Sequence, residues 1–151
     1  MQIAIEDPGT LDVRGLLEEH LRDMHTHSPP ESVHALDVRK LQQPDITFWT
    51  VRDGAVLLGC GALKQLDRSH GEIKSMRTPT SLRRQGAGRA MLTHIIAVAR
   101  GRGYERLSLE TGSMEAFLPA QQLYQHYGFT YCGPFGDYRS DPNSLFMTLM
   151  L

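Results

Sequence analysis

The segment from residue 80 to residue 89 combines residue types that suit the binding of a phosphate group. It reads Thr80-Ser81-Leu82-Arg83-Arg84-Gln85-Gly86-Ala87-Gly88-Arg89. Where a helix begins, the first backbone N–H groups have no partner within the helix, and the helix dipole adds partial positive charge. Two glycines there cost a helix about 1 kcal/mol each relative to alanine, which is explained if the backbone must approach a ligand closely. Arginines can add charge-assisted contacts, so this turn predicts a pyrophosphate site.

Other interpretations of the turn are a glycine-rich connector with solvated arginines, or one of the common nucleotide-binding motifs. The Walker pattern needs Gly-Lys-Ser/Thr, which is absent, and the dinucleotide fingerprint needs a third glycine in another register. The turn alone leaves the connector interpretation open.

The seven histidines and two cysteines do not predict a metal site. His25-Thr26-His27 together with His34 offers imidazole ligands, but a His-x-His pair without a framework of carboxylates is weak. Cys60 and Cys132 have no metal-type spacing and no recognisable base beside them, so we expect two free thiols and no acyl-cysteine.

The elements that must position the turn follow from hydrophobic periodicity. A short strand at 3–5 ends in Asp7-Pro8-Gly9, and Thr10 or Asp12 can cap a helix that Ser28-Pro29-Pro30 stops. A second short helix is expected over 32–41. Strands are expected at 46–51, 56–66 and 71–78, the first two joined by a hairpin at Asp53-Gly54.

The pattern changes after residue 78. The spacing predicts a helix over 86–102, a strand over 107–111, a helix over 114–127 and final strands at 129–132 and 145–151. An antiparallel meander followed by strand–helix–strand–helix–strand is a mixed α/β (α+β) sheet and not a doubly wound parallel one.

Three segments in this order resemble the GNAT family of N-acetyltransferases. Arg83-x-x-Gly86-x-Gly88 is similar to the family's CoA-pyrophosphate loop, and 71–78 to its bulged, splayed strand. Leu123-Tyr124 with Gly128-Phe129 resembles a third family segment. The resemblance implies one GNAT domain over 1–151, a splayed mixed sheet flanked by about four helices, and acetyl-CoA as acyl donor. Segments 28–36 and 133–138 resemble a bacterial, YsnE-like subgroup of the family.

The resemblance also implies roles in cofactor binding. The Met76 backbone N–H would bond the thioester oxygen, and the Thr78 backbone would pair with the pantetheine arm. The other cofactor-binding candidates belong to the same strand and loop: Arg77, Arg83, Arg84, Gln85, Gly86, Ala87, Gly88 and Arg89.

The catalytic candidates are Tyr124 and Glu72. The resemblance to the family segment favours Tyr124 as the general acid that protonates the leaving thiolate. Without that resemblance, the better interpretation of Tyr124 is a tyrosine that packs against the sheet. We expect such a packing role for Tyr127. Strand alternation places Glu72, Lys74 and Met76 on one face before any bulge shifts them, so Glu72 is a candidate base, directly or through a water. The alternatives are a rim carboxylate paired with Lys74, and Glu110 as the base or as a partner for the acceptor's charge.

Candidates for the acceptor site are His25, Glu31 and His34 in a variable loop, with Tyr138 shaping the pocket; the alternative is that they are surface residues. Trp49 and the Phe135–Tyr138 pair are expected in the core or a lid. The acceptor is expected to be a small or amino-acid-like amine. A protein or peptide amine is the alternative, as is a non-catalytic acyl-CoA-binding module.

The bulk composition limits the possible partners. A chain of 151 residues with 40% apolar and 22% charged residues can bury a core and is not typical of disorder. A formal net charge of −1 predicts no nucleic-acid or membrane partner. No leader or spanning segment is recognised, so we expect a cytoplasmic protein; a homodimer is left open.

Overall fold

Seven strands form one sheet in the order β1-β2-β3-β4-β5-β7-β6 in the computed structural model, which describes residues 1–151. The strands are β1 (Gln2–Ile5), β2 (Ile46–Asp53), β3 (Val56–Gln65), β4 (His70–Arg77), β5 (Arg106–Gly112), β6 (Thr130–Cys132) and β7 (Ser144–Met150). Every neighbouring pair is antiparallel except β4 and β5, which run parallel. The mixed sheet predicted from the sequence is confirmed.

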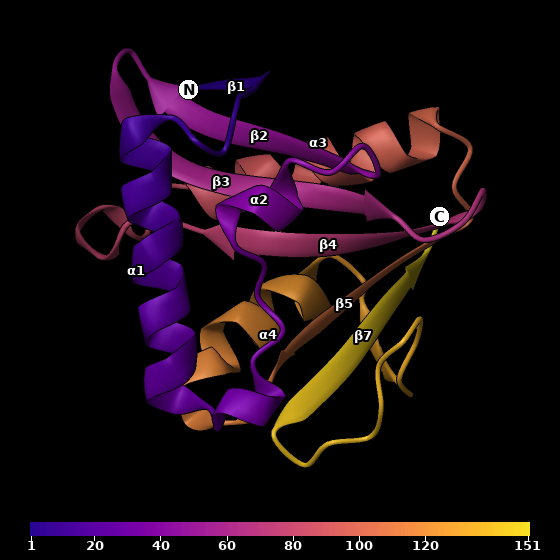
Figure 1. The fold of residues 1–151 in the computed structure, drawn as a ribbon. Coiled ribbons are helices and arrows are strands. Elements are labelled where there is room, and N and C mark those ends of the chain that lie inside the picture. Colours follow the sequence, from indigo (N-terminus) through magenta and orange to yellow (C-terminus); the bar gives the residue numbers. More distant parts are fainter.

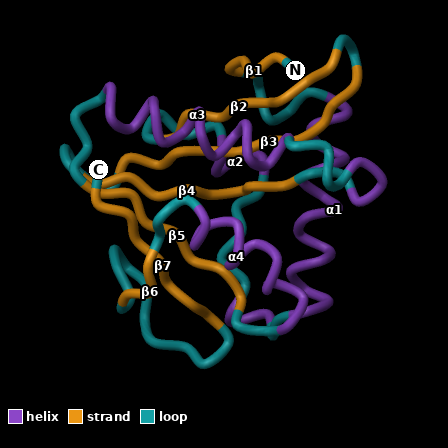
Figure 2. Tube along the Cα trace, turned by 180° about the vertical axis from the view of Figure 1, so that it is seen from behind, coloured by secondary structure: helices purple, strands orange, loops and turns teal.

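Four α-helices cover the two faces of this sheet, as Figures 1 and 2 show from opposite sides. They are α1 (Leu11–His27), α2 (Val38–Leu41), α3 (Ala87–Gly101) and α4 (Leu118–His126). Residues of α1 and α2 pack with β2 and β3 in a smaller core cluster. Residues of α3 and α4 share the larger cluster with β5 and Trp49. The sheet therefore separates two cores, and Trp49 lies in one of them, as expected.

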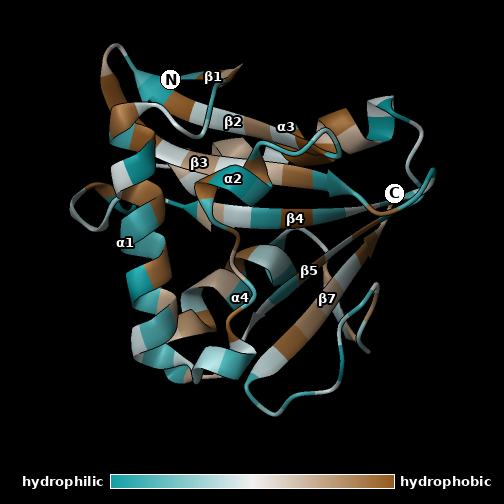
Figure 3. Cartoon of the chain, viewed as in Figure 1, coloured by the Kyte–Doolittle hydropathy of each residue, from teal (hydrophilic) through white to brown (hydrophobic).

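Local chemistry explains where the long helices begin. Helix α1 follows Thr10 and buries Val13, Leu16 and Leu17 on one face; Figure 3 shows brown and teal alternating along it. Gly86 caps α3 with φ 84°, a left-handed conformation that glycine adopts without steric cost. Pro119 lies in the first turn of α4, where its missing N–H is not needed.

Two helices differ from the sequence prediction. Residues 32–41 do not form one helix, because a 3₁₀ turn at Pro30–Ser32 and the short α2 are separated by non-helical residues. The Asp37 side chain accepts a hydrogen bond from the Lys40 backbone N–H and so caps α2, which begins only at Val38. The helix expected from 114 opens as a 3₁₀ turn at Glu115–Phe117 before α4.

Candidate active site

The sheet divides between β4 and β5. These two strands pair only at His70↔Arg106, Gly71↔Leu107 and Glu72↔Ser108, after which β4 stays with β3 and β5 stays with β7. Figure 1 shows β5 and β7 turning away from β4. A cavity of about 990 Å³ occupies this region, with walls from α1, β4, the start of α3, β5 and α4.

The start of α3 forms one end of the cavity. Gly86, Ala87 and Gly88 line it together with Arg83, Arg84 and Arg89, whereas Gln85 does not. Arg84 has φ 66°, a conformation that costs a non-glycine residue about 1–3 kcal/mol and that is found where function requires it. Free helix N–H groups and exposed arginines make this end suitable for a phosphate group.

A bulge in β4 sorts its side chains between the two faces of the sheet. Ser75 has φ 55°, and the pairing of β4 with β3 slips between Cys60 and Ala62 opposite it. Met76 therefore points towards Met91 and Ile95 of α3. Glu72 and Lys74 share the other face, as alternation predicts, but the bulge separates Met76 from them.

Arg77 is held by helix α1. Its guanidinium lies 2.7 Å from a carboxylate oxygen of Glu19 and 2.6 Å from one of Asp23. Glu19 also accepts hydrogen bonds from Thr80, which, with the bond from Arg77, lower the pKa of its carboxyl to about 2. Glu19 thus connects α1 both to β4, through Arg77, and to the loop before α3, through Thr80. The sequence had placed Arg77 in the cofactor site, and the structure places it in the cavity wall.

Glu72, Lys74 and Tyr138 form a buried hydrogen-bonded group at the other end of the cavity. The Lys74 ammonium donates to Glu72 (3.2 Å) and to the Tyr138 hydroxyl (2.9 Å), and that hydroxyl donates to Glu72. Burial and the Glu72 carboxylate raise the pKa of Tyr138. The His34 ring contacts Tyr138 edge-on at 5.0 Å, and burial, followed by the charge of Lys74, lowers the pKa of His34. The pairing of Glu72 with Lys74, one of the two interpretations of Glu72, is present.

Glu110 also lines the cavity at this end, but it has no such partners. Burial is the main cause that raises the pKa of Glu110 to about 7, with the Glu72 and Asp141 charges adding to it and Lys74 opposing it. No hydrogen bond contributes to this shift. Glu110 is therefore a carboxyl group that changes its charge near neutral pH.

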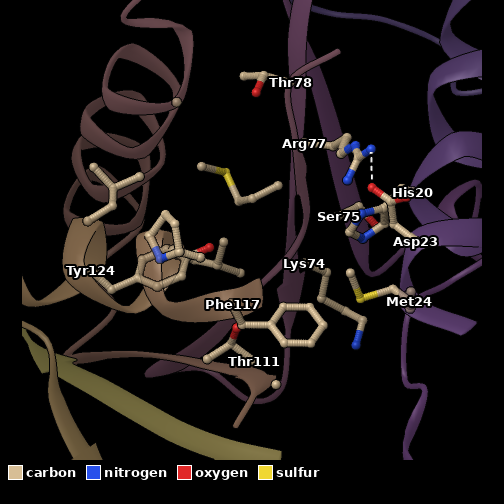
Figure 4. Close-up of a pocket in the computed structure, with 18 of the residues that line it drawn as sticks. His20, Asp23, Met24, Lys74, Ser75, Arg77, Thr78, Thr111, Phe117 and Tyr124 are labelled. Atoms are coloured by element: carbon tan, nitrogen blue, oxygen red, sulfur yellow. Dashed lines mark ion pairs between the residues drawn. The ribbon is translucent and has the colours of Figure 1, made fainter. Parts of the chain in front are cut away.

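Tyr124 faces the same cavity from α4, as Figure 4 shows, opposite His20, Asp23 and Met24 on α1. Its side chain is buried against Phe129, and burial together with the Glu110 charge raises the pKa of the phenol. Tyr127 lies outside the cavity and bonds Thr93 (3.1 Å) and the Arg89 carbonyl oxygen (3.3 Å), so the expected packing role is confirmed.

The cavity thus gathers most of the predicted site residues but not all of them. Those that line it are Glu72, Met76, Arg77, Thr78, Arg83, Arg84, Gly86, Ala87, Gly88, Arg89, His34, Glu110, Tyr124 and Tyr138. His25, Glu31 and Gln85 are exposed and lie outside it.

Several lining residues were not recognised from the sequence. Phe117 is one, and a face of α1 supplies His20, Asp23, Met24 and His27. Their spacing of i, i+3, i+4 and i+7 marks one side of a helix, and this signal could have identified them. Burial lowers the pKa of His20 to about 4, so its imidazole is neutral at pH 7.

Two further classes of feature are absent from the structure. No group of three or more His, Cys, Asp or Glu side chains could hold a metal ion. None of the helices has the length and apolar character that crossing a membrane requires.

Comparison with known proteins gives one consistent family. The model of the acetyltransferase (GNAT) family matches residues 13–129. The uncharacterised N-acetyltransferase YsnE of Bacillus subtilis is 57% identical over 151 residues, covering 100% of both chains. An IAA acetyltransferase of Azospirillum brasilense is 40% identical over 146 residues, or 96% of this chain and 94% of that protein.

Solved structures share the fold over nearly the whole chain. A Klebsiella pneumoniae protein assigned as an acyl-CoA N-acyltransferase has a TM-score of 0.80 and 25% identity, covering 99% of this chain and 97% of its own. A GNAT acetyltransferase of Elizabethkingia anophelis, solved with acetyl-CoA bound, has a TM-score of 0.68 and 20% identity over 99% and 97%.

Proposed function

Because this chain belongs to the GNAT acetyltransferase family and is an N-acetyltransferase, we propose that it moves the acetyl group of acetyl-CoA to a primary amine of a small molecule. The observation that carries this proposal is a single cavity with two different ends. One end has arginines and the free N–H groups of α3, and the other has the buried Glu72, the half-buried Glu110 and Tyr124.

The residues at the first end fit the diphosphate of acetyl-CoA. Arg84 and Arg89 have no ion-pair partner in the protein, and the Arg83 guanidinium is only within 3.9 Å of Asp23. The left-handed Gly86 brings the backbone to the cavity without a side chain. The Elizabethkingia protein binds acetyl-CoA on the same fold. In our proposal the thioester arm lies along β4 at Met76 and Thr78, where β4 has no partner on the β5 side.

The attacking amine must lose a proton. A lysine-like ammonium has a pKa of about 10.4, so supplying the neutral amine at pH 7 costs roughly 4–5 kcal/mol unless a base assists. Glu72 already accepts hydrogen bonds from Lys74 and Tyr138, whereas Glu110 has free lone pairs. We therefore assign the base to Glu110, with Glu72 holding Lys74 and Tyr138 in place.

The transfer then needs one acid. The bound ammonium ion first gives one proton to Glu110, which releases it to solvent. The neutral amine nitrogen then forms a bond to the acetyl carbon and its second proton passes to Glu110, while the C–S bond breaks and the thiolate takes the phenolic proton of Tyr124. The proton on Glu110 finally returns to the Tyr124 phenolate through water. In water this last transfer is uphill by about 2 kcal/mol, because a phenol has a pKa near 10 and a thiol near 8.5. Burial raises the pKa of Tyr124, but it also raises the pKa of a thiol at the same place. The difference between the two pKa values therefore determines whether the proton transfer is uphill.

A screen for thiol release and acetylated product tests this function. Purified enzyme with acetyl-CoA is incubated with alkylamines, amino acids, polyamines, aminoglycosides, short peptides and IAA, for which the Azospirillum relative is named. We expect acceptor-dependent release of CoA, and at least tenfold slower turnover for Tyr124→Phe with acetyl-CoA affinity within about twofold of wild type. Equal turnover would remove Tyr124 from the mechanism. Acetylation of peptides alone would favour a protein acceptor, and binding of acetyl-CoA without any transfer would favour a binding module.

A further inference from the structure

The two ends of the cavity carry opposite charge. The end at α3 has Arg83, Arg84 and Arg89, and the nearest carboxylate is that of Asp23, 3.9 Å from Arg83. The far end has Glu72 and Glu110 in its lining with one cation, Lys74. Asp141 is close enough to this end to raise the pKa of Glu110. Acidic groups therefore outnumber basic ones where the acceptor would bind.

The charge of Lys74 is already used within the protein. Its ammonium donates to Glu72 and to Tyr138, lies 5.6 Å from the centre of the Tyr138 ring, and its side chain is 9% exposed. Glu72 is 4% exposed, so the two charges are buried together and compensate each other. Removing Glu72 and Lys74 from the balance leaves Glu110 as a carboxyl group with no cation of its own.

The remaining basic groups on the walls do not change this balance. Arg77 is held between the carboxylates of Glu19 and Asp23. His20 and His34 both have lowered pKa values because of burial, so both are neutral at pH 7. His27 is exposed at the end of α1. Apart from the exposed imidazole of His27, no unpaired basic side chain lines the far end to pair with an acceptor's carboxylate.

Apolar and aromatic side chains form part of the walls at the far end, among polar ones such as Ser32 and Thr111. Phe117 is 8% exposed and lines the cavity between α4 and α1, with the His27 ring 6.2 Å away. Met24 and Tyr138 also line it. Figure 4 shows Phe117 extending towards Lys74 and Met24. Such walls suit a hydrocarbon body, and aromatic faces also tolerate a nearby ammonium ion.

We propose that the acceptor is an alkyl- or arylalkylamine that enters as an ammonium ion, pairs with Glu110 and carries no carboxylate next to the amine. This inference rests on the proposed function and narrows its acceptor class. An α-amino acid would bring its carboxylate to Glu110 and Glu72 without a cation to compensate it, and like charges in a partly desolvated cavity disfavour such binding. Free amino acids are therefore poor acceptors for this enzyme.

Matched compounds with one apolar body test the proposal. Calorimetry on the full chain saturated with CoA compares phenethylamine, L-phenylalaninamide and L-phenylalanine, and then isopentylamine with L-leucine. We expect each amine to bind at least tenfold more tightly than its amino acid. L-phenylalaninamide, in which a neutral carboxamide replaces the carboxylate, should have an affinity close to that of phenethylamine. Equal or tighter binding of the amino acids overturns the proposal, and so does the absence of binding by every compound.

A variant pair identifies Glu110 as the source of the preference. Glu110→Gln should weaken phenethylamine at least fivefold and bring its affinity close to that of L-phenylalanine. Glu105→Gln removes an exposed carboxylate just before β5, outside the cavity, and should leave both affinities unchanged. Retained CoA affinity shows that the site of Glu110→Gln is folded. If this variant still prefers phenethylamine over L-phenylalanine as strongly as wild type does, the role of Glu110 is overturned.

The two proposals fail in different ways in a parallel turnover assay. If the enzyme acetylates amino acids but not the matched amines, the proposed function is supported and the proposed acceptor class is wrong. If acetyl-CoA neither binds nor transfers its acetyl group to any amine, the proposed function falls and the acceptor class with it.

Discussion

Glu72 and Glu110 face one cavity from neighbouring strands, yet their surroundings give them different properties. Glu72 accepts hydrogen bonds from the Lys74 ammonium and from the Tyr138 hydroxyl. Glu110 is half-buried without a hydrogen-bond donor, and its pKa is raised to about 7. A pair of carboxyl groups whose environments differ in this way is typical of sites where one group moves a proton and the other holds the structure.

The raised pKa of Glu110 predicts a pH-dependent stability. The folded chain binds the Glu110 proton more tightly than the unfolded chain does, so the contribution of Glu110 to the free energy of unfolding is complete below pH about 4.5 and is lost as the pH rises through about 7. Between pH 5 and 8 we expect the wild type to lose on the order of 2 kcal/mol relative to Glu110→Gln. Urea unfolding across this range measures the difference.

The comparison with Glu110→Gln is necessary because histidines titrate in the same range. His34 and His70 have lowered pKa values, so they act in the opposite direction and lower the stability as the pH falls. These contributions cancel when the two proteins are compared. The same comparison with Glu105→Gln should show no pH-dependent difference, and parallel curves for Glu110→Gln and wild type would contradict the burial of an unpartnered carboxyl group.

At the scale of elements, helix α1 links the two ends of the cavity. Glu19 binds Arg77 of β4 and Thr80 of the loop before α3, and Asp23 binds Arg77 from the next turn of the helix. Met24 and His27, farther along the same helix, line the far end. The loop that would hold a diphosphate and the wall that would hold the acceptor therefore rest on one helix.

Glu19→Gln should loosen this link. The carboxylate is about one-third exposed and its pKa is lowered to about 2 by Thr80 and Arg77, so its stabilising effect is present at pH 7 and is lost only as the pH falls from about 4.5 towards 2. Allowing for solvent screening, we expect a loss of about 1–2 kcal/mol at pH 7 and several-fold weaker acetyl-CoA binding. Unfolding curves and calorimetry measure the two effects.

Glu18→Gln is the matched control, because Glu18 is the preceding residue, is exposed and lies outside the cavity. It should change neither quantity. If Glu19→Gln retained full acetyl-CoA affinity while losing stability, the contact would support the fold without supporting the loop.

The elements also show what a sequence can and cannot predict. The long helices and the order of elements along the chain follow from local periodicity, and the proposed pyrophosphate turn lies within ten consecutive residues. The pairing of Lys74 with Tyr138 joins positions 64 residues apart, and that of Arg77 with Glu19 joins positions 58 apart. No local pattern selects such partners. The helix predicted over 32–41 was wrong in its extent, because only Val38–Leu41 form a helix and Ser32 instead donates a hydrogen bond to Asp141, 109 residues away.

On the scale of the whole molecule, the division of the sheet defines the site. The β1–β4 half and the β5–β7–β6 half are joined by three residue pairs between β4 and β5, and the cavity lies beyond them. A ligand that fills this space contacts both halves. Binding of acetyl-CoA should therefore stabilise both halves together, through the mass-action effect that any ligand has on the folded state it binds.

Thermal unfolding with and without acetyl-CoA tests this, and two glycines provide a matched pair. At a ligand concentration of about 100 times Kd, mass action adds about 2.7 kcal/mol, which raises the Tm of a chain of this size by about 5 °C or more. Gly86 (φ 84°) and Gly103 (φ 80°) both have left-handed backbones, with nothing closer to an added Cβ than 4.0 Å at Gly86 and open space at Gly103. Glutamate at either position carries similar strain, but only Gly86 lines the cavity.

We expect both glycine variants to lose similar stability without ligand, and only Gly86→Glu to lose the Tm shift, because its carboxylate lies where the diphosphate would bind. An unchanged Tm shift in Gly86→Glu would contradict binding of the diphosphate at the start of α3. No Tm shift in the wild type at millimolar acetyl-CoA would contradict the binding of acetyl-CoA itself.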